Sequence, residues 1–181
     1  MRRLGMVSLA VLVCISCIPF APAGEAGALL DAAHWTASSA PDLLREVAKE
    51  IERLDPNDSR TLARAGQILL RADRPEEAAA VFQHAEKSDP KDDEAFVLIA
   101  AAYSERKMWA EADKWFALAT ERDPKDLDHV IEWGVSHWNR GDLEKAGQMF
   151  VKALGAEPKN SRLYYKIGRG IEQAGSAANT P

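Results

Sequence analysis

Cysteine is almost missing from this chain of 181 residues, and its two cysteines, Cys14 and Cys17, both lie near the N-terminus. The rest of the chain therefore offers no thiol for a disulfide framework, a zinc–cysteine site or a cysteine nucleophile. An excess of basic charge is also lacking, because 28 acidic residues outnumber 23 basic ones and the net charge is −5. This balance argues against nucleic-acid binding, which needs basic residues to displace phosphate counterions. With 11 glycines, 9 prolines and 46% hydrophobic residues, the composition is that of a globular protein rather than a collagen-like or disordered one.

Residue patterns typical of catalysis and of metal binding are lacking as well. None of the four histidines, His34, His84, His129 and His137, lies in a zinc-binding spacing such as H-E-x-x-H. The chain carries neither a phosphate-binding glycine loop nor a G-x-S-x-G nucleophile motif. The acidic stretch 89–94 lacks the spacing of a calcium loop, and we interpret it as the end of one helix followed by the N-cap of the next. We therefore predict no catalytic residue, no metal site and no cofactor.

One long apolar run stands at the start of the chain and predicts an export signal. A dibasic start is followed by an apolar stretch over residues 4–18 and by small residues before a cleavage point after Ala23, which is the layout of a secretory signal. The stretch is shorter than the roughly 20 residues that span a bilayer. We therefore predict a signal peptide at 1–23 and an exported protein, periplasmic or secreted. Two alternatives stay open, a lipoprotein anchored to the membrane through Cys17 and an uncleaved membrane anchor.

A constant period of about 34 residues organises the rest of the chain. Five columns of proline, small residues or phenylalanine recur with this period. The columns are Pro56, Pro90, Pro124 and Pro158; Gly66, Ala100, Gly134 and Gly168; Ala78, Ala112 and Ala146; Phe82, Phe116 and Phe150; and Ala85, Ala119 and Ala153. Recurrence at one fixed period indicates stacked copies of a single supersecondary motif.

Each copy has the pattern of two helices joined by a short turn. In residues 59–92, Ser59 is the expected N-cap, apolar residues follow at helical spacing, and Pro75 suits the first turn of a second helix. Pro90 then ends that second helix. Because one helix pair cannot bury its apolar face alone, neighbouring copies stack into an all-α solenoid of antiparallel helix pairs.

These columns resemble the signature of the tetratricopeptide-repeat family. In the first copy the signature falls on Leu62, Ala65, Gly66, Leu69, Ala78, Phe82, Ala85 and Pro90. The resemblance covers residues 59–160 and implies three repeats, at 59–92, 93–126 and 127–160, in a superhelix. His137 stands at the tyrosine place of the signature, so we expect a packed core histidine. Lys107 replaces the usual glycine of a turn between helices, so we expect that turn to be strained or rebuilt.

The two ends of the array are less regular. Residues 24–58 fit the period in length but poorly in chemistry, so we interpret them as a degenerate repeat or an N-terminal cap. Residues 161–174 repeat the first-helix pattern alone, which in this family indicates a helix that caps the array. We expect residues 175–181 to form a flexible tail.

The resemblance also implies a concave groove lined by the first helix of each repeat. In this family, certain positions of each first helix point into the groove. In this sequence those positions imply an apolar floor of Ala63, Val97, Ala101, Ile131, Val135, Trp138 and Tyr165. The flanking places are basic or polar toward the two ends and acidic between them: Arg60, Gln67, Glu94, Asp128, Arg162 and Arg169. An apolar strip bordered by charge suits a peptide or a helix as ligand.

We therefore predict a non-catalytic interaction module in the cell envelope. It would bind a peptide or a helix of another protein and support the assembly of an envelope complex. Two other hypotheses stay open, a self-associating structural protein that forms homo-oligomers and an outer-membrane lipoprotein assembly factor. The Lys and Asn with which chaperone-binding members of the family hold a C-terminal carboxylate are missing from the corresponding places, so chaperone tails are not the expected partner.

Overall fold

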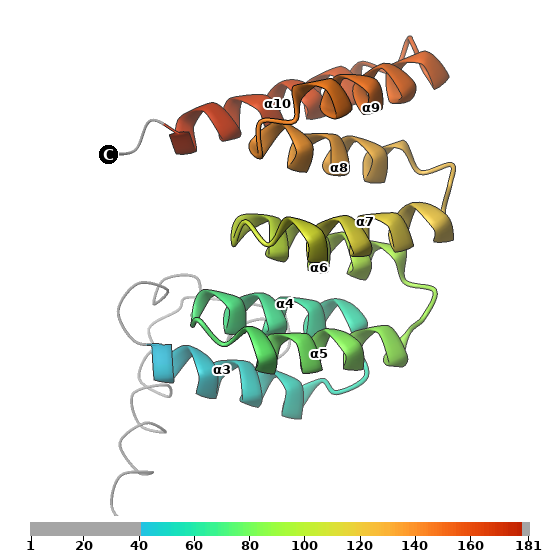
Figure 1. Cartoon of the computed structure of the whole chain (residues 1–181). Helices are drawn as coiled ribbons and strands as arrows, with labels where there is room; N and C mark the ends of the chain where they lie inside the picture. The colour runs from blue at the N-terminus through green and yellow to red at the C-terminus, as the bar shows by residue number, and fades with distance from the viewer. Residues whose placement is uncertain (1–40, 179–181) are drawn as a thin grey trace, which may run out of the picture. The chain divides into compact units, whose positions relative to one another are not determined.

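The computed structural model describes residues 41–178 of the chain, with side chains up to Gln173. This part of the chain consists of helices joined by short turns, with no strand in it (Figure 1). The helices in chain order are α3 (Pro41–Leu54), α4 (Ser59–Arg71), α5 (Pro75–Ser88), α6 (Asp93–Glu105), α7 (Trp109–Arg122), α8 (Leu127–Asn139), α9 (Leu143–Ala156) and α10 (Ser161–Ala178). The signal peptide predicted at 1–23 lies outside the described residues.

The helices keep the repeat period of the sequence. One set of helices begins one repeat period apart, and we call its members the first helices: α4, α6, α8 and α10. The other set has the same spacing, and we call its members the second helices: α3, α5, α7 and α9. The predicted fold class, an all-α helical-repeat solenoid, is confirmed. None of the helices within 41–178 is long and apolar enough to cross a membrane.

The described residues fall into two compact units that meet within helix α6, between Ala95 and Phe96. In the first unit, α4 packs against both α3 and α5. The close approach of α4 and α5 depends on Gly66, because a Cβ built there would lie 2.2 Å from Cε1 of Phe82. The glycine column of the sequence thus has a steric cause, since the phenylalanine ring occupies the space of the missing side chain.

The N-cap of α4 differs from the sequence-based expectation. Asp58, not Ser59, is the N-cap, and its carboxylate accepts a hydrogen bond from the Arg60 backbone N–H at 3.1 Å. Ser59 is the first helical residue, and its hydroxyl donates to the Asp92 carboxylate at 2.6 Å. The carboxylate before the helix satisfies a backbone donor that lacks an intrahelical partner.

Helix α3 stands at the second-helix place of the irregular region 24–58. Its buried residues, Leu44, Val47, Ala48 and Ile51, lie one repeat period before the buried residues of α5, Ala78, Val81, Phe82 and Ala85. Alanine, phenylalanine and alanine in α5 are therefore replaced by leucine, alanine and isoleucine in α3. The large and small side chains exchange places, so a packed face is retained although the family signature is lost. Residues 24–40 of this region lie outside the described part.

The turn between the two helices of each repeat contains one residue in the left-handed backbone conformation. Asp73, Lys107 and Gly141 have φ of 60°, 58° and 83° and follow one another at the repeat period. At the middle turn, the Met108 N–H donates to the Tyr103 carbonyl at 3.0 Å across the left-handed Lys107. Glycine adopts this conformation without a steric penalty. The strain expected at Lys107 is therefore present, because a lysine occupies the left-handed position.

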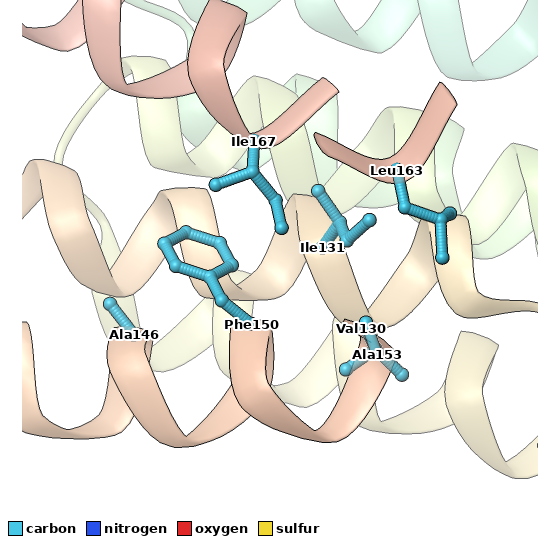
Figure 2. Packing of buried hydrophobic residues seen from close by; sticks show 7 residues of the cluster. All are labelled: Val130, Ile131, Ala146, Phe150, Ala153, Leu163 and Ile167. Atoms are coloured by element: carbon cyan, nitrogen blue, oxygen red, sulfur yellow. The ribbon is translucent and has the colours of Figure 1, made fainter. Parts of the chain in front are cut away.

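The second unit contains most of α6 and all of α7 to α10. Its C-terminal core joins three helices, and Figure 2 shows Leu163 and Ile167 of α10 lying beside Ile131 of α8 and Phe150 of α9. Helix α10 extends to Ala178, so the boundary predicted at residue 174 is wrong, and 175–178 are helical rather than part of a flexible tail. The stretch contains no proline that would end the helix.

Candidate protein-binding surface

Three first helices lie side by side in the second unit. The hydroxyl groups of Ser104 in α6 and Ser136 in α8 are 2.8 Å apart, and α10 packs mainly on α8. The residues predicted in the groove floor of this unit that solvent can reach are Val97, Ala101, Val135, Trp138 and Tyr165. We call this set the first-helix face.

The accessibility of the first-helix face increases toward α10. Val97 and Ala101 of α6 and Val135 and Trp138 of α8 are half-buried. Tyr165 of α10 is 63% exposed. These five side chains therefore offer apolar carbon and an aromatic ring to a ligand, and tyrosine and tryptophan are favoured anchors in protein interfaces.

Two of the residues predicted in the groove floor are core residues instead. Ile131 is 0% exposed and belongs to the core between α8, α9 and α10 (Figure 2). Leu163 and Ile167 of α10 are part of the same core, so a ligand cannot reach Ile131. In the first unit, Ala63 is 1% exposed and is inaccessible as well.

Helix α10 also packs on part of the first-helix face. A Cβ built on Gly170 would lie 2.3 Å from Cγ2 of Val135, so the glycine lets α10 approach α8 closely. Val135 and Trp138 both pack against the C-terminal core. These two side chains therefore serve the packing of the unit and form part of its surface, whereas Tyr165 is not part of that core.

Two of the basic residues predicted at the ends of the groove, Arg60 and Arg162, bind acidic residues at the start of the neighbouring first helix. In the first unit, Arg60 pairs with Asp92 at 3.0 Å and also with Glu94. The side chain of Gln67 is half-buried on the same helix as Arg60. Half of the Arg60 side chain remains exposed, so the guanidinium is partly neutralised but still reachable.

The second unit repeats this pairing on α10. Arg162 and Lys166 both bind the Asp128 carboxylate of α8, at 2.6 and 2.7 Å. Arg169 is exposed, and its hydrogen bond with Tyr165 is the main cause that raises its pKa. Arg169 and Tyr165 therefore present a cation and an aromatic ring together next to the apolar residues.

A partly buried polar network around His137 of α8 corresponds to no sequence motif. The Trp133 indole N–H and Arg140 both donate to the Asp113 carboxylate, at 2.8 and 2.7 Å. His137 is 2% exposed and lies 3.2 Å from the Asp142 carboxylate, with Arg140 in contact as well. The sequence feature that indicates this network is the repeat period, because it places a histidine, His137, at the position of Tyr103 in the preceding repeat.

Burial and charge set the ionisation of this network. Desolvation, together with the Arg140 guanidinium, lowers the pKa of His137 below its ordinary range. Burial opposes ionisation of Asp113, but its hydrogen bonds from Arg140 and Trp133 outweigh that effect and lower its pKa. Hydrogen bonding thus favours the ionised form of Asp113 and burial favours the neutral form of His137, as expected for a structural network around the partly buried Arg140–Asp113 ion pair.

Comparisons with known proteins agree with the repeat architecture. Alternating helices at one constant spacing define a helical-repeat protein. Residues 69–130 match the family model described as tetratricopeptide repeat, which supports the predicted type of repeat. Tetratricopeptide-repeat proteins generally mediate protein–protein interactions.

Solved structures with a similar fold include two named proteins. YrrB, described as a TPR protein with an unusual peptide-binding site, has a TM-score of 0.50 and 20% sequence identity, covering 90% of this chain and 84% of that chain. A mutant of MamA has a TM-score of 0.43 and 16% identity, covering 83% of this chain and 88% of that chain. No curated protein matches the sequence.

Proposed function

We propose that the chain is a non-catalytic protein-binding module that holds a peptide or a helix of a partner protein on the first-helix face. The observation that carries this proposal is the row of accessible apolar side chains on three adjacent first helices, which includes the 63% exposed Tyr165. An accessible apolar strip next to charged groups matches the needs of peptide recognition. The peptide-binding site described for YrrB is a precedent for such binding on a similar fold.

The proposal includes export to the cell envelope, where the module would support the assembly of a protein complex. Its support is the sequence alone, with a dibasic start, an apolar stretch and a small-residue cleavage point. The N-terminus of the protein isolated from its native cells should then be Gly24, as read by intact mass. A chain that retains Met1, or one that begins at Cys17 with a lipid adduct, would contradict the proposed cleavage.

Cross-linking in cells tests the binding surface. A photoreactive residue at position 165 should trap one defined protein, which mass spectrometry then identifies. The same residue at position 151 is the control, because Val151 is 72% exposed but lies on the second helix α9, outside the first-helix face. Trp138 is less suitable for the label because it packs against the C-terminal core.

Self-association is the outcome that would replace this proposal. If position 165 cross-links only to a second copy of the chain, and light scattering shows a mass that rises with concentration, the face is a homo-oligomer contact. If positions 165 and 151 trap the same proteins, the first-helix face has no special role in binding. A distinct protein trapped from position 165 alone supports the module.

A further inference from the structure

Helix α10 has the sequence of a first helix and packs on α8 and α9 of the preceding repeat, but within the described residues no second helix of its own repeat covers its other side. In the three preceding repeats the chain turns back at Asp73, Lys107 and Gly141. The corresponding place in α10 is residue 175, and the helix continues through it to Ala178. The chain therefore does not fold back onto α10 where the other repeats do.

Places that are buried in the complete repeats are open on α10. Leu62, Phe96 and Val130 are at most 4% exposed, whereas Tyr164 at the same place is 50% exposed. Ala100 is 0% exposed, and Gly168 at the corresponding place is exposed. A face that the second helix covers elsewhere is thus uncovered on α10.

The glycines of the repeats indicate which side chain would fit against this face of α10. In two complete repeats, a Cβ on Gly66 or Gly134 would lie 2.2 or 2.6 Å from Cε1 of the phenylalanine on the second helix. At Gly168 no atom of the described residues beyond the neighbouring turns of α10 itself lies within 4 Å of such a Cβ. A glycine inside a helix weakens the helix relative to alanine. Among the described residues, no side chain of another helix occupies the space beside Gly168. Gly170 differs, because its missing side chain accommodates Val135.

We propose that the exposed Tyr164 and Gly168 form a docking face for an amphipathic helix of another protein, which would complete the repeat on α10. Ile171 borders this face; it is half-buried and also packs against the C-terminal core. The complete repeats specify the chemistry of that helix. In α9 the residues that pack on a first helix are Ala146, Phe150 and Ala153, all of them buried. The partner helix should therefore carry A-x-x-x-F-x-x-A on one face, with the phenylalanine ring over Gly168. This docking face is separate from the first-helix face and goes beyond the function proposed above.

A peptide with the sequence of α9, residues 143–156, is a suitable probe, and a hydrocarbon staple on its polar side should keep it helical. Binding to the full-length protein is measured by fluorescence anisotropy. The parent protein should bind the probe, and Gly168→Ala should weaken binding by about tenfold or more, because the added methyl group would clash with the docked phenylalanine. The same variant should raise the Tm, since alanine favours the helix and its methyl group meets no other element among the described residues. A loss of binding with a gain in stability cannot arise from misfolding.

Gly147→Ala is the matched control. Gly147 also lies inside a helix with no atom within 4 Å of an added Cβ, so this variant should raise the Tm and leave the affinity for the probe unchanged. A probe with Phe150→Ala should bind the parent at least tenfold more weakly. The proposal is overturned if the parent does not bind the probe, or if Gly168→Ala binds it as well as the parent does. A parent dimer that Gly168→Ala converts to a monomer would overturn it too, because the occupant would then be a second copy.

Discussion

His137 shows how one residue of the repeat changes the properties of its surroundings. It stands where Tyr103 stands in the preceding repeat, and both side chains are buried. The histidine, however, is held between the Asp142 carboxylate and Arg140, and its pKa is lowered mainly by desolvation. A phenol would remain neutral here across the physiological pH range, whereas an imidazole becomes charged in mild acid.

Acidification should therefore destabilise the parent protein more than a variant without this histidine. The unfolded chain binds the proton on His137 more readily than the native chain does. The free energy of unfolding thus falls as the pH drops through the ordinary histidine pKa near 6.5. Urea unfolding at pH 7.5 and 5.5 measures this, and the loss should be smaller for His137→Gln. Groups with shifted pKa elsewhere, such as Glu132, are present in both proteins and cancel in the comparison. An equal loss in both proteins would show that His137 does not contribute.

At the scale of elements, the turns show where the sequence departs from what the backbone favours. All three turns place a left-handed residue at the same place of the repeat, but only the last uses glycine, Gly141. Lys107 holds φ of 58°, a conformation in which the Cβ of an L-residue crowds the backbone. The chain retains the turn because helices on both sides fix it.

Lys107→Gly should stabilise the protein by up to about 1 kcal/mol. The substitution removes the left-handed penalty, and the greater freedom of glycine in the unfolded chain offsets part of the gain. Thermal unfolding should show a higher midpoint. Gly141→Lys is the reciprocal change and should lower the midpoint, since it introduces the same penalty at the equivalent turn. An unchanged or lower midpoint for Lys107→Gly would contradict the assignment of strain to this residue.

The helices were predictable from the sequence where one residue type recurs at the repeat period. They were less predictable where large and small side chains exchange positions and keep the same buried face. The phenylalanine and glycine columns predicted the helix pairs because Phe82 needs the space that Gly66 leaves. Helix α3 lacks the signature because Leu44 and Ala48 exchange the large and small places. A search for fixed residue types does not register such an exchange, although the buried places are the same.

The candidate surface was less predictable because accessibility depends on neighbouring helices. Ile131 occupies a family place that faces the groove, yet α10 packs on α8 and places Leu163 and Ile167 in the same core (Figure 2). The pairing of Arg162 with Asp128 likewise depends on how two helices are aligned. The family pattern indicates which side of each helix faces the groove. The packing of α10 on α8 then determines which residues on that side remain accessible to a ligand.

At the scale of the whole molecule, one repeat makes contacts within the chain and is proposed to make contacts with partners. Within the chain, the repeat joins helices through small residues and phenylalanine rings. Toward partners, the proposed contacts are the first-helix face of the second unit and the docking face around Gly168 on α10. Neither surface contains a catalytic arrangement among the described residues, and the ionisable groups next to them, such as Arg162 and Asp128, are engaged in ion pairs.

Binding at the first-helix face is tested by measuring how tightly the partner trapped from position 165 binds a variant of that face. Val97→Asp combined with Tyr165→Asp should weaken binding about a hundredfold by calorimetry, because two apolar contacts are replaced by charges that must be desolvated. Both side chains are accessible, so the circular dichroism spectrum should be unchanged. Val151→Asp, at an exposed position outside the face, should bind like the parent. A double variant that binds its partner as tightly as the parent would contradict the account.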